Sequence, residues 1–261
     1  MNVVEAAGIL LQAESSGSAI APLTDTWEKL DVATAYEVQA ETLRRRLERG
    51  EHVVGVKLGL TSAAKQRTMG INRPLLGWLT DAMVLPAGEP IGPGLIHPRA
   101  EPEIVFVLAH RLAGPGVTAP QAMSAIGSVC GGIEVIDSRF AGFRFRLPDV
   151  VADNASSARV ALGPVTAVPG GLDLSLEACL FTVNGDVIDS ATGAAVLGHP
   201  AQALALAANV LAERHLALEP GWLVLTGGMT DAVPLAPGTS ALAEFTHLGA
   251  VTVHGRADGS S

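Results

Sequence analysis

The chain has 261 residues and a formal net charge of −9, and 48% of its residues are apolar but only 4% aromatic. This length suits one large domain whose core is built mainly from alanine, valine, leucine and isoleucine. The longest basic run is Arg44-Arg45-Arg46, so binding to nucleic acid is not expected. The sequence shows no signal peptide and no apolar stretch of about 20 residues, and we therefore expect no membrane segment and a cytoplasmic location.

Two helices are expected before the first strand. Apolar residues recur at helical spacing over residues 3–14, and a Ser/Gly segment ends that pattern. Asp31 is a good N-cap for a second helix, which Gly50 would end. The two helices predict a small N-terminal helical cap, and we group this cap with the first strand and a lid in residues 1–75.

The first strand is expected at residues 53–60 and contains one cation, Lys57, among apolar and glycine residues. Glycine within a strand is typical of a close approach by a ligand or by another backbone segment. The alternative interpretation is a lysine on an edge strand, where it would block the addition of further strands. Residues 61–72 have no long apolar run and lie between glycine-rich ends, so they are expected to form a mobile lid.

Two glutamates stand at the start of a buried strand. Glu101 and Glu103 flank Pro102, and five apolar residues follow them. Side chains two apart on a strand share a face, so the two carboxylates are expected side by side, where they require a cation. Glu134 adds a third carboxylate within another apolar run, and an all-oxygen set suits Mg²⁺ or Mn²⁺. The alternative is an edge strand with solvated glutamates.

The second half of the chain is rich in strands. Phenylalanine and arginine alternate as in a strand over residues 143–146, and Asn184-Gly185 predicts a tight hairpin turn. A helix is expected at 199–215, followed by a buried strand at 222–226. Residues 255–261 are expected to form a disordered tail.

Several motifs occur together in one order. They resemble the hydratase/decarboxylase branch of the fumarylacetoacetate hydrolase superfamily over residues 30–254, and within it the decarboxylases of 2-oxo-3-hexenedioate. The motifs are Gly55-Val56-Lys57-Leu58-Gly59-Leu60-Thr61-Ser62, Glu101-Pro102-Glu103, Glu134-Val135-Ile136-Asp137-Ser138-Arg139, Val151-Ala152-Asp153-Asn154-Ala155-Ser156 and Leu197-Gly198-His199-Pro200. One departure is Cys130-Gly131-Gly132, which we expect to loosen the strand that carries Glu134.

The resemblance implies an α+β fold with a mixed β-roll core, a metal-binding catalytic domain at residues 76–254, and Mg²⁺ or Mn²⁺ without an organic cofactor. It also implies a homo-oligomer and a complex with a partner hydratase. The residues that it assigns to the site are Glu101, Glu103 and Glu134 for the metal, Lys57 and Asp81 for catalysis, and Leu60, Ser156, Thr226 and Arg139 for the substrate.

The implied reaction is decarboxylation of 2-oxo-3-hexenedioate, a small 2-oxo-dicarboxylate. Mg²⁺ with three glutamates has a net charge of −1, so a dianionic substrate requires a protein cation, and Lys57 is well placed to provide it. One of Arg73, Arg139 or Arg144 is expected to hold the distal carboxylate. The first alternative is hydration of 2-hydroxypenta-2,4-dienoate. The second is hydrolysis of a carbon–carbon bond in an acylpyruvate. Residues 61–77 argue against hydrolysis because they contain neither histidine nor glutamate.

Overall fold

A computed structural model of residues 1–261 describes the chain except for residues 62–65, 68–73, 87 and 257–261. Most of the predicted lid and of the predicted tail therefore lie outside the described residues.

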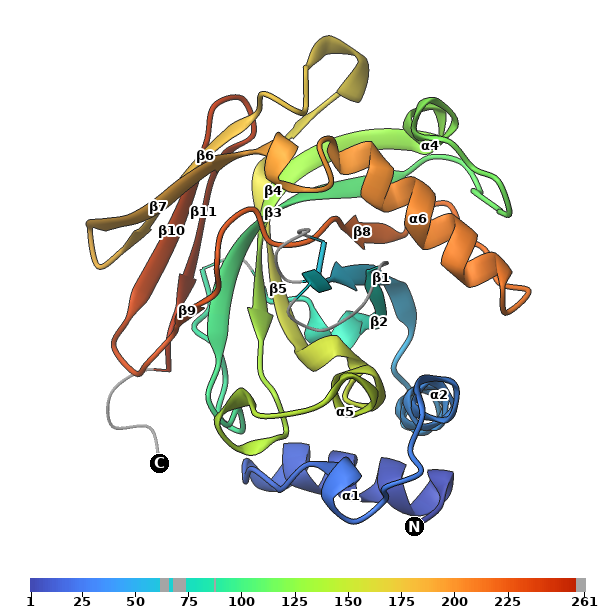
Figure 1. Ribbon diagram of the computed structural model, residues 1–261. Coiled ribbons are helices and arrows are strands. Elements are labelled where there is room, and N and C mark those ends of the chain that lie inside the picture. The colour runs from blue at the N-terminus through green and yellow to red at the C-terminus, as the bar shows by residue number, and fades with distance from the viewer. Residues whose placement is uncertain (62–65, 68–73, 87, 257–261) are drawn as a thin grey trace.

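A mixed seven-stranded sheet forms the centre of the protein (Figure 1). Six strands run in the order β2-β1-β8-β3-β4-β5, and β9 pairs with β3. The β1–β8 pair is parallel and the other pairs are antiparallel. The strands are β1 (Val53–Gly59), β2 (Leu75–Thr80), β3 (Arg99–Leu108), β4 (Ile126–Ile136), β5 (Ser157–Ala167), β8 (Leu223–Leu225) and β9 (Val233–Pro234).

A second sheet of four antiparallel strands in the order β11-β10-β6-β7 lies to the left of the main sheet in Figure 1. The predicted Asn184-Gly185 turn is confirmed, because both residues have positive φ between β6 and β7. The strands are β6 (Ala178–Val183), β7 (Asp186–Thr192), β10 (Ser240–Phe245) and β11 (Gly249–His254).

The glycines before Glu134 allow the two sheets to approach each other. A Cβ atom at Gly131 would lie 2.4 Å from Cε2 of Phe245 on β10, so only glycine fits there. The ladder between β3 and β4 runs through Gly131 and Gly132 without interruption, whereas the register between β4 and β5 shifts at this point. The expected loosening therefore affects the β5 side only, and the strand that carries Glu134 keeps its pairing with β3.

Two helices lie over the upper part of the main sheet in Figure 1, α4 (Ala119–Ala125) and α6 (Pro200–Ala212). Residues Gly193–Ala212 are long and apolar enough to cross a membrane, but 56% of the apolar window is buried inside the fold. The helix α6 packs against α4 and β1. Its burial is also typical of a core helix in a soluble protein.

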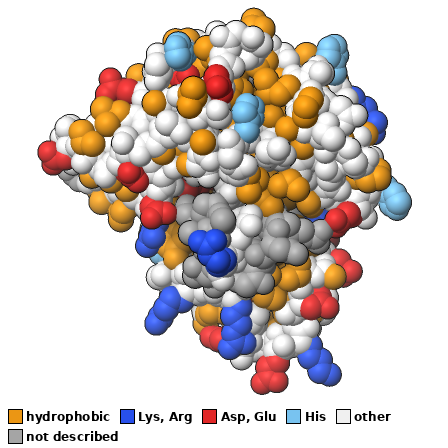
Figure 2. Space-filling view, turned by 45° about the horizontal axis from the view of Figure 1, so that its top comes forward, with side chains coloured by type: hydrophobic (Ala, Val, Ile, Leu, Met, Phe, Trp, Pro, Cys, Tyr) orange, Lys and Arg blue, Asp and Glu red, His pale blue; other side chains and the backbone are white. Residues whose placement is uncertain are grey.

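The helical cap has a hydrophobic core of its own. It contains α1 (Val3–Ser16) and α2 (Val32–Glu48), which begin at side-chain N-caps from Asn2 and Asp31, and it packs against α5 (Leu147–Ala152). On the face of the molecule that Figure 2 shows, Lys, Arg, Asp and Glu side chains gather over the lower part. The two predicted helices are confirmed, whereas the division of the chain at residue 75 stays a prediction.

The strand predicted over residues 143–146 is wrong, because no strand occurs among the described residues between β4 and β5. Residues Ala141–Phe143 form a short 3₁₀ turn in which Gly142 and Phe143 have φ of 64° and 56°. Positive φ at two successive residues is incompatible with an extended strand. The alternation of phenylalanine and arginine arises because Phe145 packs against the core of the cap while Arg144 and Arg146 remain exposed.

Candidate active site

The three glutamates meet on one face of the main sheet. Glu101 on β3 lies directly opposite Glu134 on β4, and Glu103 follows two residues later on the same face. One carboxylate oxygen from each lies within 4.8 Å of the others, and all three side chains are buried. Like charges placed directly opposite each other destabilise a sheet, so this arrangement requires a compensating cation.

The pairing of β3 explains why Pro102 is tolerated between the glutamates. Pro102 is the fourth residue of β3. On one side of β3, β9 pairs with Arg99 and Ala100, and β8 pairs with Val105 to Val107. Neither of these strands reaches Pro102, so its missing N–H interrupts no ladder on that side.

The carboxylates have the unused acceptor atoms that a metal site needs. Oε1 of Glu103 and Oε1 of Glu134 are buried and accept no hydrogen bond from the part of the chain that the structure describes. Buried polar atoms are normally paired, so two unpaired oxygens in one cluster fit the coordination of a cation. Carboxylate oxygens in this number suit Mg²⁺ or Mn²⁺, and the three glutamates therefore fit a hard divalent cation.

Electrostatics favour a cation at the same point. Burial raises the pKa of Glu103 well above its usual value, and repulsion from Glu134 and Glu101 raises it further. Burial also raises the pKa of Glu134, although Lys57 opposes this rise. A bound divalent cation would reverse these effects because it stabilises the ionised carboxylates.

Lys57 is the buried cation next to the carboxylates. Its Nζ lies 2.9 Å from Oε2 of Glu134 and donates a hydrogen bond of 3.0 Å to the carbonyl oxygen of Ala155. Burial alone would lower the pKa of Lys57, but attraction by the three glutamates outweighs burial and raises it, so the ammonium is charged at neutral pH. The alternative interpretation as an edge lysine is wrong, because β1 lies between β2 and β8.

A left-handed turn brings further groups to the site. Asn154, Ala155 and Ser156 have φ of 53°, 52° and 58°, a conformation that non-glycine residues rarely adopt. The side chain of Asn154 holds this turn, since its Oδ1 accepts from the N–H of Trp78 and its Nδ2 donates to the carbonyl of Trp78. The turn directs the Ala155 carbonyl to Lys57 and leaves the buried Ser156 hydroxyl without a partner among the described residues.

A cavity of about 440 Å³ opens above the carboxylates. Two of the residues predicted to bind substrate, Leu60 and Ser156, line it together with Lys57 and Glu101. Two further charged residues and an apolar wall line the cavity without having been indicated by the sequence: Arg99, Asp231, Gly228, Phe143, Phe145 and Val150. The adjacent Gly227 donates its N–H to Oε2 of Glu103 at 2.7 Å, which fixes that carboxylate.

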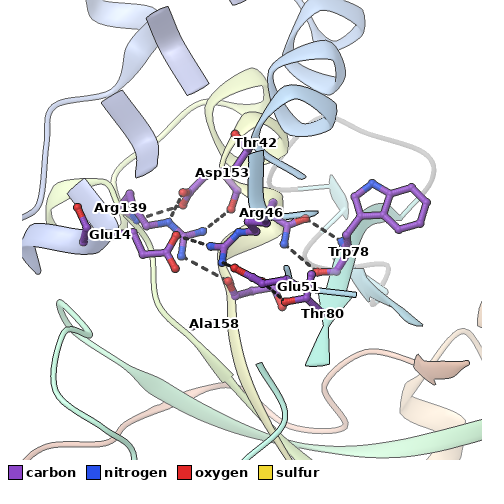
Figure 3. A network of polar contacts seen from close by, with 12 residues as sticks. Glu14, Thr42, Arg46, Glu51, Trp78, Thr80, Arg139, Asp153 and Ala158 are labelled. Atoms are coloured by element: carbon purple, nitrogen blue, oxygen red, sulfur yellow. Dashed lines mark hydrogen bonds and ion pairs between the residues drawn. The ribbon is translucent and has the colours of Figure 1, made fainter. Parts of the chain in front are cut away.

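A buried polar network joins the helical cap to the left-handed turn (Figure 3). Arg139 forms an ion pair with Asp153, the residue directly before the turn, and Arg46 of α2 pairs with Glu14 of α1. Burial raises the pKa of Asp153 to about 6, although the charge of Arg139 opposes this rise. Arg139 is thus occupied by Asp153 and does not line the cavity, contrary to its predicted contact with substrate.

Two more predicted residues lie away from the cavity. Thr226 is fully buried and donates its hydroxyl to the carbonyl of Ile104 at 2.8 Å. Asp81 is exposed and binds the backbone N–H and the ring of His52. Antiparallel pairing places Gly77 opposite Lys57 and Thr80 opposite Val53, so Asp81 lies more than about 10 Å farther along the strand than Lys57. The structure therefore does not bring Asp81 to Lys57.

Comparison with known proteins relates this chain to two kinds of enzyme, although no family model matches it. It is 43% identical to a 4-oxalocrotonate decarboxylase of Pseudomonas sp. (strain CF600), over 89% of each chain. It is also 38% identical to a 2-hydroxyhexa-2,4-dienoate hydratase of Comamonas testosteroni, over 88% of each chain.

Solved structures agree with these relatives. The structure of 4-oxalocrotonate decarboxylase from Pseudomonas putida G7, complexed with magnesium and adipate, matches with a TM-score of 0.94 and 40% identity, over 97% of this chain and 96% of that one. A fumarylacetoacetate hydrolase from Exiguobacterium antarcticum shares the fold at 16% identity, with a TM-score of 0.60 over 78% of this chain and 74% of that one. The predicted α+β fold is confirmed, and the chain belongs to the family of enzymes that comprises the 4-oxalocrotonate decarboxylases and the 2-hydroxydienoate hydratases.

Proposed function

We propose that this enzyme catalyses the Mg²⁺-dependent decarboxylation of 2-oxo-3-hexenedioate to 2-hydroxypenta-2,4-dienoate and CO₂. The observation that carries the proposal is the cluster of Glu101, Glu103 and Glu134 within 4.8 Å, with a buried Lys57 beside it. Mg²⁺ is the proposed metal, and Mn²⁺ is the expected substitute because it favours the same oxygen ligands.

The substrate is a vinylogous β-keto acid. As the bond between C5 and C6 breaks, its electron pair forms the C4=C5 bond, the C3=C4 pair moves to C2=C3, and the C2 oxygen receives the negative charge. Uptake of one proton then gives the dienol and leaves CO₂. A cation bound by the three glutamates would supply Lewis-acid stabilisation of the C2 oxygen and the C1 carboxylate.

The residues of the chain itself have three tasks in this reaction. The three glutamates hold the cation at the floor of the cavity. Lys57 stays charged because of its carboxylate neighbours, and it stabilises the negative charge that develops on the substrate. The apolar wall, which includes Phe145 and Val150, limits the access of water to the reacting atoms.

Hydration of 2-hydroxypenta-2,4-dienoate is the second candidate function, and the 38% identity to a dienoate hydratase favours it. Both reactions use an electrophilic cation beside a 2-oxygenated carboxylate, so the metal cluster alone does not separate them. What favours decarboxylation is the higher identity to a decarboxylase and the second cation, Arg99, in the same cavity.

Product analysis tests the proposed function. The purified enzyme with Mg²⁺ is incubated with 2-oxo-3-hexenedioate, and separately with 2-hydroxypenta-2,4-dienoate. We expect CO₂ and the C5 dienol from the first substrate in equal amounts, and loss of both products when EDTA removes the metal. Formation of a hydrated product from the dienoate, without CO₂ from the dicarboxylate, would instead identify the enzyme as a hydratase.

A further inference from the structure

Arg99 is a cation in the cavity that the reaction described above has not yet used. It is the first residue of β3 and lies two residues before Glu101, so the two side chains share one face of the strand and both line the cavity. The loop before Arg99 is tied to the end of β4, because the carboxylate of Asp137 accepts from the N–H groups of Ile96 and His97 at 2.8 Å.

An aromatic ring holds the guanidinium group of Arg99. Its Cζ lies 4.3 Å from the ring centroid of Phe143, and that ring packs against His97 with 4.7 Å between centroids. A cation–π contact positions a guanidinium group without using its N–H donors. No ion pair of Arg99 with a carboxylate occurs in the part of the chain that the structure describes, so its planar set of donors remains available to an anion.

We propose that Arg99 binds the distal C6 carboxylate of the substrate and thereby selects dicarboxylates over monocarboxylates. This inference rests on the proposed function and assigns one end of its substrate. The Cα atoms of Arg99 and Glu101 are about 7 Å apart at the rise of an antiparallel strand. An extended chain of six carbons, with bonds of about 1.5 Å, covers about 6 Å, so a substrate held at the glutamates by its C1 end can reach the Arg99 side chain.

The three arginines considered from the sequence serve this purpose less well. Arg139 is buried and paired with Asp153, Arg144 is exposed and does not line the cavity, and Arg73 lies outside the described residues. Among the described residues that line the cavity, the cations are Lys57 and Arg99. Lys57 is already bound to Glu134 at the metal end, so Arg99 remains for the distal end.

The chemistry predicts which kinetic constant depends on Arg99. The C6 carboxylate loses its charge as it becomes CO₂, so its ion pair with Arg99 weakens toward the transition state. An interaction stronger in the ground state than in the transition state improves binding but does not accelerate the chemical step. We therefore expect Arg99→Gln to raise KM on the order of 10- to 100-fold, as for loss of a charge-assisted hydrogen bond, while kcat does not fall and rises to the extent that the ion pair is weaker in the transition state.

A binding experiment separates this inference from the proposed function. The Mg²⁺-loaded enzyme is titrated calorimetrically with adipate, a six-carbon dicarboxylate, and with pentanoate, which lacks the distal carboxylate. We expect wild type to prefer adipate and Arg99→Gln to lose that preference through weaker adipate binding alone. Arg99→Lys should retain an intermediate preference because it keeps the charge, and Arg144→Gln, at an exposed arginine outside the cavity, should behave as wild type.

Two results would overturn the role of Arg99: an unchanged adipate preference in folded Arg99→Gln, or an equal weakening of adipate and pentanoate. If the Arg99→Gln variant does not fold, Arg99→Lys provides the test. An Arg99→Lys variant that bound adipate no more tightly than pentanoate would also contradict the inference. Failure of the proposed function would give a different result. The preference for adipate would still depend on Arg99, but incubation with 2-oxo-3-hexenedioate would release no CO₂.

Discussion

Lys57 shows how a single residue joins the fold to the proposed chemistry. A lysine that is 2% exposed would normally lose its proton, yet the three buried glutamates keep it charged. Gly77, directly opposite on β2, makes room for its stem, because a Cβ atom there would lie 3.1 Å from Cγ and Cδ of Lys57. The cation is therefore held at one place relative to the metal ligands.

Substitution of Lys57 by methionine keeps most of the side-chain volume and removes the charge. We expect Lys57→Met to lower kcat by about 10²- to 10³-fold, as for loss of one group that stabilises developing negative charge. Mg²⁺ affinity should stay the same or rise, because a competing cation has left Glu134. Steady-state kinetics and Mg²⁺ titration test this, with Lys29→Met at an exposed lysine as control. Turnover close to wild type would remove Lys57 from the proposed mechanism.

The side-by-side placement of Glu101 and Glu103 could be predicted from the sequence because strand periodicity is a local property, and the resemblance added the assignment of Lys57 to the same site. The role of Arg99 could not be predicted, since its guanidinium group is held by Phe143, a residue of a 3₁₀ turn that the sequence pattern had placed in a strand. Asp81 was misplaced for a related reason. The register of β1 with β2 decides how far it lies from Lys57, and the sequence does not specify that register.

At the scale of elements, the left-handed turn Asn154–Ser156 connects α5 to β5 and forms part of the cavity wall. Left-handed conformation costs about 1–2 kcal/mol for each non-glycine residue, so three in a row need support from their surroundings. The two hydrogen bonds between Asn154 and Trp78 provide this support, because they join the turn to the backbone of β2. No sequence pattern predicted this turn.

Removal of the Asn154 amide should disturb the turn without touching the glutamates. We expect Asn154→Ala to lower the free energy of unfolding by about 2–3 kcal/mol, since two partly buried hydrogen bonds are lost. It should also lower kcat at least tenfold while Mg²⁺ affinity is retained, because Ser156 and the Ala155 carbonyl lose their positions. Chemical denaturation, kinetics and Mg²⁺ titration measure these three quantities.

Asn184→Ala is the matched control for this experiment. Asn184 also has positive φ and accepts a hydrogen bond from the N–H of Ser240, but it lies in the exposed turn between β6 and β7, outside the cavity. This control should lose stability with kcat unchanged. An Asn154→Ala variant that was destabilised but fully active would show that the turn has a structural role only.

At the scale of the whole molecule, the main sheet, the second sheet and the helical cap agree with the α+β fold expected from the sequence. The order of the strands was beyond local patterns, because β8 enters between β1 and β3 from a distant part of the chain. The homo-oligomer and the complex with a partner hydratase stay predictions. Whatever the assembly, β3 and β4 bring the three glutamates together within one chain.

Anomalous diffraction from crystals soaked in Mn²⁺ tests the central claim, that these three glutamates form a divalent metal centre, most directly. We expect one strong peak with an oxygen from each of Glu101, Glu103 and Glu134 at about the 2.1 Å typical of Mg²⁺ or slightly beyond it, and loss of this peak in folded Glu103→Gln. A peak with the three carboxylates more than about 3 Å away, or no peak there at saturating Mn²⁺, would contradict the claim.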